Sequence, residues 1–214
     1  MNTLRRNTRT AVRRTALAAA VTAAALVLAA CGGDDSGSGD KPSPSASASE
    51  KTGAHNKADV SFATGMIPHH RQAVEMADLA ETRASSSKVK DLAEKIKKAQ
   101  DPEITTMSGW LKAWGEKVPE DMSGMDHGGM DHGDDSEMPG MMDGKDMEKM
   151  KKSEGKDFDT MFLNMMIEHH EGAVEMSQTE KKKGAYGPAT SLADDIIAAQ
   201  NAEIAQMRKL LGKD

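Results

Sequence analysis

The amino-acid sequence predicts an all-α fold, a four-helix bundle built from two repeated helical hairpins. Residues 57–114 align with residues 157–214 at a constant offset of 100 and without a gap, and 19 of the 58 aligned positions are identical. The identical residues recur three, four and seven positions apart, which is the spacing of one face of an α-helix. A break rich in Ser, Gly or Pro divides each repeat near its middle, so each repeat is expected to contain two helices.

Residues 1–30 have the pattern of an export signal. Five arginines and no acidic residue come before or at the start of an apolar run from Ala16 to Ala30, which is short for a membrane-spanning helix. The run Leu28-Ala29-Ala30 leads into Cys31, the only cysteine of the chain, and this arrangement resembles a bacterial lipobox. We therefore expect lipidation of Cys31 and anchoring to the outer face of the cytoplasmic membrane. An ordinary secreted protein with a chance cysteine at the boundary is the alternative.

The mature chain is expected to begin with a flexible tether and to be strongly acidic. Residues 31–57 are mostly Gly, Ser, Asp, Pro and Ala, which bury too little apolar surface to fold. Removal of residues 1–30 takes away five of 28 basic side chains and none of the 34 acidic ones, which leaves a net charge of −11. This charge argues against nucleic acid as a partner and is compatible with attracting cations.

The folded domain is predicted over residues 58–214, with the first repeat at 58–114, a connection at 115–156 and the second repeat at 157–214. The helices of each repeat are expected to break at residues 84–87 and 184–188. Pro68 and Pro102 lie inside predicted helices, where a proline bends a helix or marks its start. The connection is long enough to run the length of a bundle, so a crossover topology and a simple up-down-up-down topology are both open.

Each repeat places a His-His pair on its apolar face, three residues after a methionine. Carboxylate-bridged di-iron bundles use Glu-x-x-His on one helix face, a pattern that this chain lacks. A thioether takes the place of that carboxylate, and thioethers together with imidazoles favour copper, especially Cu(I), over iron. Glu103 and Glu203 are expected to face the histidines, as hydrogen-bonding partners or as co-ligands. The predicted metal ligands are Met66, His69, His70, Met76, Glu103, Met107, Met166, His169, His170, Met176, Glu203 and Met207.

The residues of these faces also have a simpler interpretation. Methionine at helical spacing often serves only to fill a core that has few aromatic side chains. A buried His–Glu hydrogen-bond network can serve only to fix the register of the helices.

The connection between the repeats contains a second candidate site. Eight methionines occur among the 29 residues from Met122 to Met150, together with Asp, Gly and two histidines. Gly and Asp interrupt any apolar face, so these methionines are expected to be exposed on a disordered chain that binds soft cations with low specificity. A short amphipathic helix is expected over residues 145–153. The predicted accessory ligands are Met122, Met125, His127, Met130, His132, Met138, Met141 and Met142.

The paired motifs resemble the family catalogued as domain of unknown function 305. The similarity rests on Met-Ile-Pro-His-His-Arg-Gln-Ala-Val-Glu-Met at 66–76, on Met-Ile-Glu-His-His-Glu-Gly-Ala-Val-Glu-Met at 166–176 and on Met-Pro-Gly-Met-Met at 138–142. It implies a ferritin-like bundle, export from the cytoplasm and, for members with an assigned role, periplasmic copper binding. At the level of residues, the resemblance points to Met66, His69, His70, Met76 and their equivalents Met166, His169, His170 and Met176. The doubled Met-Asp-His-Gly run at 125–133 is similar to the runs of bacterial copper-resistance proteins.

Three functions are open at this point. The first is a non-catalytic copper-binding lipoprotein that holds Cu(I) in preference to Cu(II), accepts silver as a surrogate, and sequesters copper or hands it to a copper transporter or cuproprotein. The second is a ferritin-like metal oxidase, against which the missing Glu-x-x-His weighs. The third is a helical interaction module in which the His pairs are structural.

Overall fold

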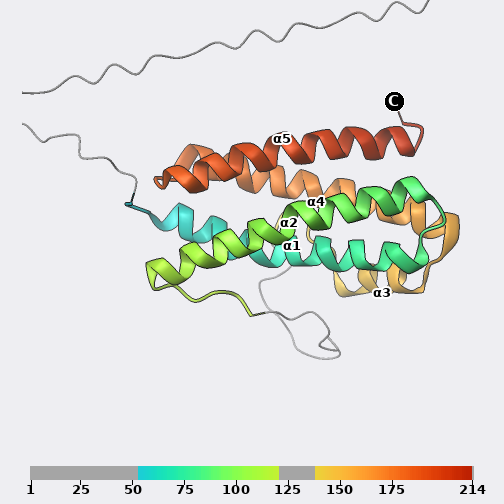
Figure 1. Cartoon of the computed structure of the whole chain (residues 1–214), viewed down its shortest axis with the longest axis horizontal. Helices are drawn as coiled ribbons and strands as arrows, with labels where there is room; N and C mark the ends of the chain where they lie inside the picture. The colour runs from blue at the N-terminus through green and yellow to red at the C-terminus, as the bar shows by residue number, and fades with distance from the viewer. Residues whose placement is uncertain (1–52, 121–137, 214) are drawn as a thin grey trace, which may run out of the picture. The chain divides into compact units, whose positions relative to one another are not determined.

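The computed structural model describes residues 53–120 and 138–213. The export signal with Cys31, most of the tether and the predicted ligands Met122, Met125, His127, Met130 and His132 lie outside the described residues. The all-α prediction is confirmed. The helices are α1 (Lys57–Arg83), α2 (Ser87–Trp114), α3 (Gly144–Lys152), α4 (Gly155–Lys183) and α5 (Gly187–Leu210) (Figure 1). Within the described ranges, no helix is long and apolar enough to cross a membrane.

The helix ends follow from local sequence. The side chain of Asn56 accepts hydrogen bonds from the backbone N–H groups of Ala58 and Asp59, and the carboxylate of Asp59 accepts one from the N–H of Asn56 in return. This reciprocal capping box satisfies donors that the first turn of α1 would otherwise leave unpaired. Gly115 ends α2 with a φ of 75°, a conformation that favours glycine. Pro102 marks no helix start, because α2 begins fifteen residues earlier at Ser87 and continues through it.

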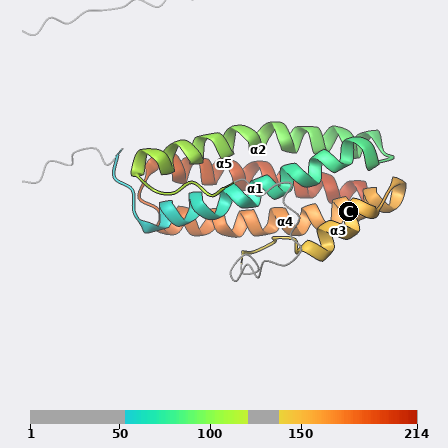
Figure 2. The same cartoon turned by 90° about the horizontal axis from the view of Figure 1, so that it is seen from below.

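The helices are connected by a crossover. Within each repeat, the two long helices pack against each other over their length, and α1 and α4 meet between the repeats (Figures 1 and 2). Ala84, which follows α1, pairs with Gly155 at the start of α4, whereas Asn56, which precedes α1, donates a 2.8 Å hydrogen bond to the carbonyl of Lys183 at the end of α4. The helices α1 and α4 are therefore antiparallel. The chain must return from the end of α2 to the opposite end of the bundle before α4 begins, which is the topology of ferritin-like bundles.

One aspartate at the start of each repeat binds the turn of the other repeat. The carboxylate of Asp59 accepts hydrogen bonds from two backbone N–H groups of the α4–α5 turn, at 3.0 and 2.9 Å. Its equivalent Asp159 accepts them from two backbone N–H groups of the α1–α2 turn, at 3.1 and 3.0 Å. The two repeats are thus joined by reciprocal polar contacts as well as by apolar packing.

Two apolar clusters fill the bundle on either side of the histidines. Each cluster combines the Phe and Met that precede the His pair in one repeat with the small residues that follow it in the other, because α1 and α4 are antiparallel. Full burial of one large apolar side chain is worth about 1.5–3 kcal/mol, so these clusters supply most of the driving force for folding. Cluster 1 includes Ala73, Met76, Ile96, Phe162, Met166 and Met207. Cluster 2 includes Phe62, Met66, Met107, Leu111, Ala173 and Ile196.

The end of the connection is ordered against the bundle. We call residues 138–142 the strap. The expectation that Met138, Met141 and Met142 are exposed on a disordered chain is wrong, because all three are half-buried and Met142 packs against cluster 1. The side chain of Gln72 donates to the carbonyl of Met142 at 2.8 Å and accepts from its N–H at 2.7 Å. The short helix expected over 145–153 is present as α3, which buries Met147 and Met150.

Candidate metal centre

Four histidines lie buried in the middle of the bundle. His69 and His70 come from α1, His169 and His170 come from α4, and none is more than 1% exposed. The ring centroids of His69 and His169 are 3.8 Å apart, and the two ring planes are inclined by 42°. Because these two histidines occupy equivalent positions of the repeats, their contact lies on the pseudo-twofold axis of the bundle.

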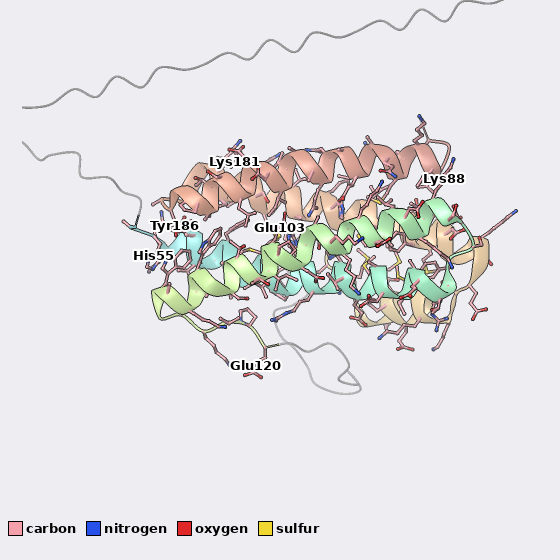
Figure 3. The ribbon with its side chains drawn as sticks, viewed as in Figure 1. His55, Lys88, Glu103, Glu120, Lys181 and Tyr186 are labelled. Atoms are coloured by element: carbon pink, nitrogen blue, oxygen red, sulfur yellow. The ribbon has the colours of Figure 1, made fainter. Side chains whose placement is uncertain are left out.

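Three of the four imidazoles use Nε2 for a hydrogen bond to an oxygen. Nε2 of His70 is 2.7 Å from Oε2 of Glu103, and Nε2 of His170 is 2.6 Å from Oε2 of Glu203. Figure 3 labels Glu103 near the middle of α2. Nε2 of His69 is 3.1 Å from the carbonyl oxygen of Pro139 in the strap. A carbonyl or carboxylate oxygen only accepts, so the proton lies on Nε2 and a neutral ring keeps its lone pair on Nδ1.

The remaining imidazole nitrogens have no hydrogen-bond partner in the part of the chain that the structure describes. These nitrogens are Nδ1 of all four histidines and Nε2 of His169, and all of them are buried. Each such group costs about 1–3 kcal/mol when it is buried unpaired. A hydrogen bond from one ring nitrogen with the other left open is the usual arrangement of a histidine that binds a metal, since the bonded oxygen fixes the tautomer.

Burial keeps the imidazoles of His69 and His169 neutral. Burial, reinforced by the neighbouring His70, lowers the pKa of His69 to about 3, although the hydrogen bond to Pro139 acts in the opposite direction. Burial also holds the pKa of His169 well below its ordinary value, and the three other histidines add to this shift. At neutral pH a metal ion therefore has no proton to displace from either ring.

The structure divides the predicted thioethers into two groups. Met66 and Met107 belong to cluster 2, and Met176 packs half-buried against it. Met76, Met166 and Met207 belong to cluster 1. The sulfurs therefore flank the histidines on both sides. Glu103 and Glu203 are each bonded to a histidine, which is the hydrogen-bonding role that the sequence left open beside that of a co-ligand.

The donor set around the histidines is soft. Within residues 53–120 and 138–213, no three His, Cys, Asp or Glu side chains are grouped so as to hold a metal ion. An ion at this centre would have to bind few imidazoles or take thioethers as further ligands. Both conditions suit a soft monovalent cation better than iron or magnesium, which prefer oxygen-rich sites.

Several residues of the centre carry no signal in the repeat pattern. Pro139, Gln72 and Gly172 position the strap over the histidines, and they lie in the connection or at positions where the repeats differ. Gly172 admits the strap, because a Cβ there would lie 1.9 Å from the carbonyl oxygen of Pro139. Gln72 and Gly172 escape a search for identities, and a comparison of the differences between the repeats finds them, whereas Pro139 lies outside both repeats.

A second buried polar cluster lies near the start of α1. Burial, and then the hydrogen bond and charge of the neighbouring Asp59, raise the pKa of Glu180 to about 8. Burial acts to raise the pKa of Asp59 as well, but hydrogen bonds from the backbone of Tyr186, Asn56 and Ala185 and from protonated Glu180 lower it overall. Glu180 is therefore mostly neutral around neutral pH.

The fold and its centre define a class of protein, an all-α bundle with paired, buried histidines at the middle of its two central helices. This chain belongs to the family described as domain of unknown function (DUF305), whose profile matches residues 59–211. No curated protein matches the chain at a significant level.

Solved structures of similar proteins have the same fold. A DUF305 protein from Streptomyces coelicolor, described as secreted, is 31% identical with a TM-score of 0.63 over 73% of this chain and 91% of its own. A DUF305 fragment from Deinococcus radiodurans is 27% identical with a TM-score of 0.63 over 74% and 98%. CopM in its Cu(II)-bound form is 35% identical with a TM-score of 0.58 over 71% and 94%. CopM has also been solved with Cu(I), with silver and as the apo form. These ions are the copper, and the silver surrogate, that the sequence predicts.

Proposed function

We propose that this chain is an extracytoplasmic, non-catalytic copper-binding lipoprotein that sequesters Cu(I), or hands it to a copper transporter or cuproprotein. Cu(I) is the preferred ion and Cu(II) a weaker one, because the available donors are imidazoles and thioethers. Lipid at Cys31 would hold the domain near the outer face of the cytoplasmic membrane, with residues 31–57 as a tether. Similarity to CopM, whose structures contain copper, supports the choice of ion.

One observation carries this proposal. The two central helices bring the ring centroids of His69 and His169 to 3.8 Å from each other. Among residues 53–120 and 138–213, the buried imidazoles keep nitrogens without a hydrogen-bond partner, and buried methionines lie on both sides. A purely structural His–Glu network would use up its polar atoms, because unpaired buried groups are costly. The open imidazole nitrogens are better explained by a metal ion that binds a few of them and takes thioethers as further ligands.

A metal oxidase receives less support from this geometry. Such a site needs carboxylates that bridge or chelate an ion, whereas Glu103 and Glu203 are occupied by His70 and His170 at 2.7 and 2.6 Å. Thioether ligands also favour the reduced state of copper, which suits holding the ion rather than cycling its oxidation state.

The test is an anaerobic Cu(I) titration against a competing chelator. The variant His69→Gln/His169→Gln removes the central imidazoles and keeps polar side chains of similar size. The matched control is His55→Gln, since His55 is exposed and stacks on Trp114 at a centroid distance of 4.4 Å, away from the centre. Figure 3 shows His55 beside Tyr186 at one end of the bundle.

We expect the central variant to lose at least about tenfold in Cu(I) affinity, a change of about 1.4 kcal/mol, and the His55 variant to bind like the wild type. Equal affinity of all three proteins would refute the proposed site. In a separate aerobic assay, catalytic consumption of oxygen after addition of Cu(I) would favour the oxidase instead. Circular dichroism at 222 nm checks that the variant remains helical.

A further inference from the structure

The two repeats differ where the strap lies against them. Position 65 is Gly in α1, and its equivalent in α4 is Met165; position 172 is Gly in α4, and its equivalent in α1 is Gln72. Gly172 leaves room for the backbone of Pro139, and Gln72 binds the backbone of Met142 through two hydrogen bonds of 2.8 and 2.7 Å. The strap therefore fits on one side of the pseudo-twofold axis only.

Gly140 makes this close approach achievable. It has a φ of 78°, and a Cβ there would lie 2.5 Å from the carbonyl oxygen of Glu168 and 3.0 Å from that of His169. Only glycine fits both the backbone conformation and the space. The strap is thus seated directly on the turn of α4 that carries the His pair.

Gly65 opens a space that two thioethers enter. A Cβ added to Gly65 would lie 3.0 Å from Cε of Met176 and 3.6 Å from Sδ of Met138. In the other half of the bundle, Met165 replaces this glycine and packs against cluster 1, to which Met76, the equivalent of Met176, belongs. The space exists on one side only, and a methionine of the strap occupies it.

These two thioethers lie at the edge of the bundle rather than in its core. Met138 and Met176 are both half-buried, whereas His69 and His169 are at most 1% exposed. Pro139, the neighbour of Met138, bonds directly to His69 through its carbonyl oxygen at 3.1 Å. An ion held by the two sulfurs would therefore lie next to the segment that covers the imidazoles.

We propose that Met138 and Met176 form a soft-metal entry site, which binds Cu(I) or Ag(I) through two thioether sulfurs before the ion reaches the histidines. This inference rests on the proposed copper-binding function. It adds the position at which the ion first binds and the route from there to the histidines. The site belongs to one half of the bundle, so the repeat does not give two equivalent copies. Two neutral sulfur ligands select soft monovalent ions and leave harder divalent ions in water.

The test follows Ag(I), a diamagnetic surrogate for Cu(I), by NMR of protein labelled with ¹³C at the methionine methyl groups. We expect the Met138 and Met176 methyl signals to shift together at low Ag(I). Met138→Leu keeps the bulk of the side chain and removes the sulfur, and should weaken Ag(I) binding at least about tenfold. The matched control is Met165→Leu, at the position of the other repeat that is equivalent to Gly65, which should change affinity less than about twofold.

A second variant separates loss of a ligand from disturbance of the strap. Gly65→Met gives α1 the residue that α4 has at the equivalent position, and should displace Met138 and abolish the paired methyl shift. Unshifted methyl signals of Met138 and Met176, or equal affinities of Met138→Leu and Met165→Leu, would overturn the entry site. Binding by the wild-type protein would in that case leave the proposed function intact. A wild-type protein that binds neither Ag(I) nor Cu(I) would overturn both.

Discussion

Replacement of Glu180 by Gln is expected to remove one pH-dependent part of the stability. Glu180 is 1% exposed, and burial beside Asp59 raises its pKa from 4.5 to about 8. Between these two values the folded protein binds one proton more than the unfolded chain. The contribution of Glu180 to the free energy of unfolding is therefore fully present at low pH and is lost as the pH rises toward 8.

The size of this effect has an upper limit. A difference of one bound proton changes the free energy of unfolding by at most about 1.4 kcal/mol per pH unit. From about pH 5.5 to about pH 7.5, wild-type stability should thus fall by at most about 2.8 kcal/mol relative to Glu180→Gln, whose amide is neutral over the whole window.

The assay is urea unfolding followed by circular dichroism at several pH values in this window. The difference between wild type and variant is the quantity to use, because His69 and His169 contribute with the opposite sign. Their folded-state pKa values are lowered, so they stabilise increasingly as the pH rises through the ordinary histidine range. The two proteins share that term, and it cancels.

The first repeat supplies a matched control. It has Ala80 and Ala84 where the second repeat has Glu180 and Gly184. A Cβ on Gly184 would lie 2.1 Å from Oε1 of Glu180 and 2.8 Å from the backbone oxygen of the same residue, so removal of the glutamate side chain removes the shorter of these two contacts. Glu180→Ala/Gly184→Ala should fold and show the same pH dependence as Glu180→Gln. Identical pH profiles of wild type and both variants would refute the reasoning.

Two further predictions concern the metal centre. In the chelator titration, Glu103→Ala should weaken Cu(I) binding about 10- to 100-fold, because it releases the ring of His70. Glu103→Gln keeps a hydrogen-bond acceptor and should retain most of the Cu(I) affinity. Equal losses of affinity in the two variants would make Glu103 a direct ligand instead. Gly172→Ala should displace the strap, because its Cβ would lie 1.9 Å from the carbonyl oxygen of Pro139. The backbone N–H of Met142 should then exchange faster with solvent in a hydrogen-exchange experiment. Gly109→Ala, with no atom within 4 Å, is the control, and unchanged exchange in both proteins would contradict the close packing.

Much of this architecture follows from the repeat. Equal spacing of apolar residues in two aligned segments defines four helices, and the same register brings His69 and His169 together once the helices pack about a twofold axis. Apolar periodicity is a local signal, and helix formation largely obeys it.

The strap and the crossover depend on contacts that periodicity does not encode. Met138-Pro139-Gly140 has the composition of a loop, and its burial results from complementary space at Gly65 and Gly172, far away in sequence. The Met-rich composition therefore predicted exposure at Met138, Met141 and Met142, where the structure has packing. The Asp59–Glu180 pair was missed for a related reason, since Ala80 replaces Glu180 in the first repeat and the alignment of identities passes over it.

The aspartates at the starts of the two repeats make each hairpin depend on the other for its polar contacts. Asp59 completes a turn that belongs to the second hairpin, and Asp159 completes a turn that belongs to the first. A single hairpin would leave its carboxylate and its turn amides unsatisfied, and a second identical hairpin would satisfy both through an isologous dimer. The chain is thus a homodimer interface enclosed in one polypeptide. Covalent fusion frees the two halves to diverge, and the one-sided strap is a feature that a symmetric dimer of identical hairpins could not have.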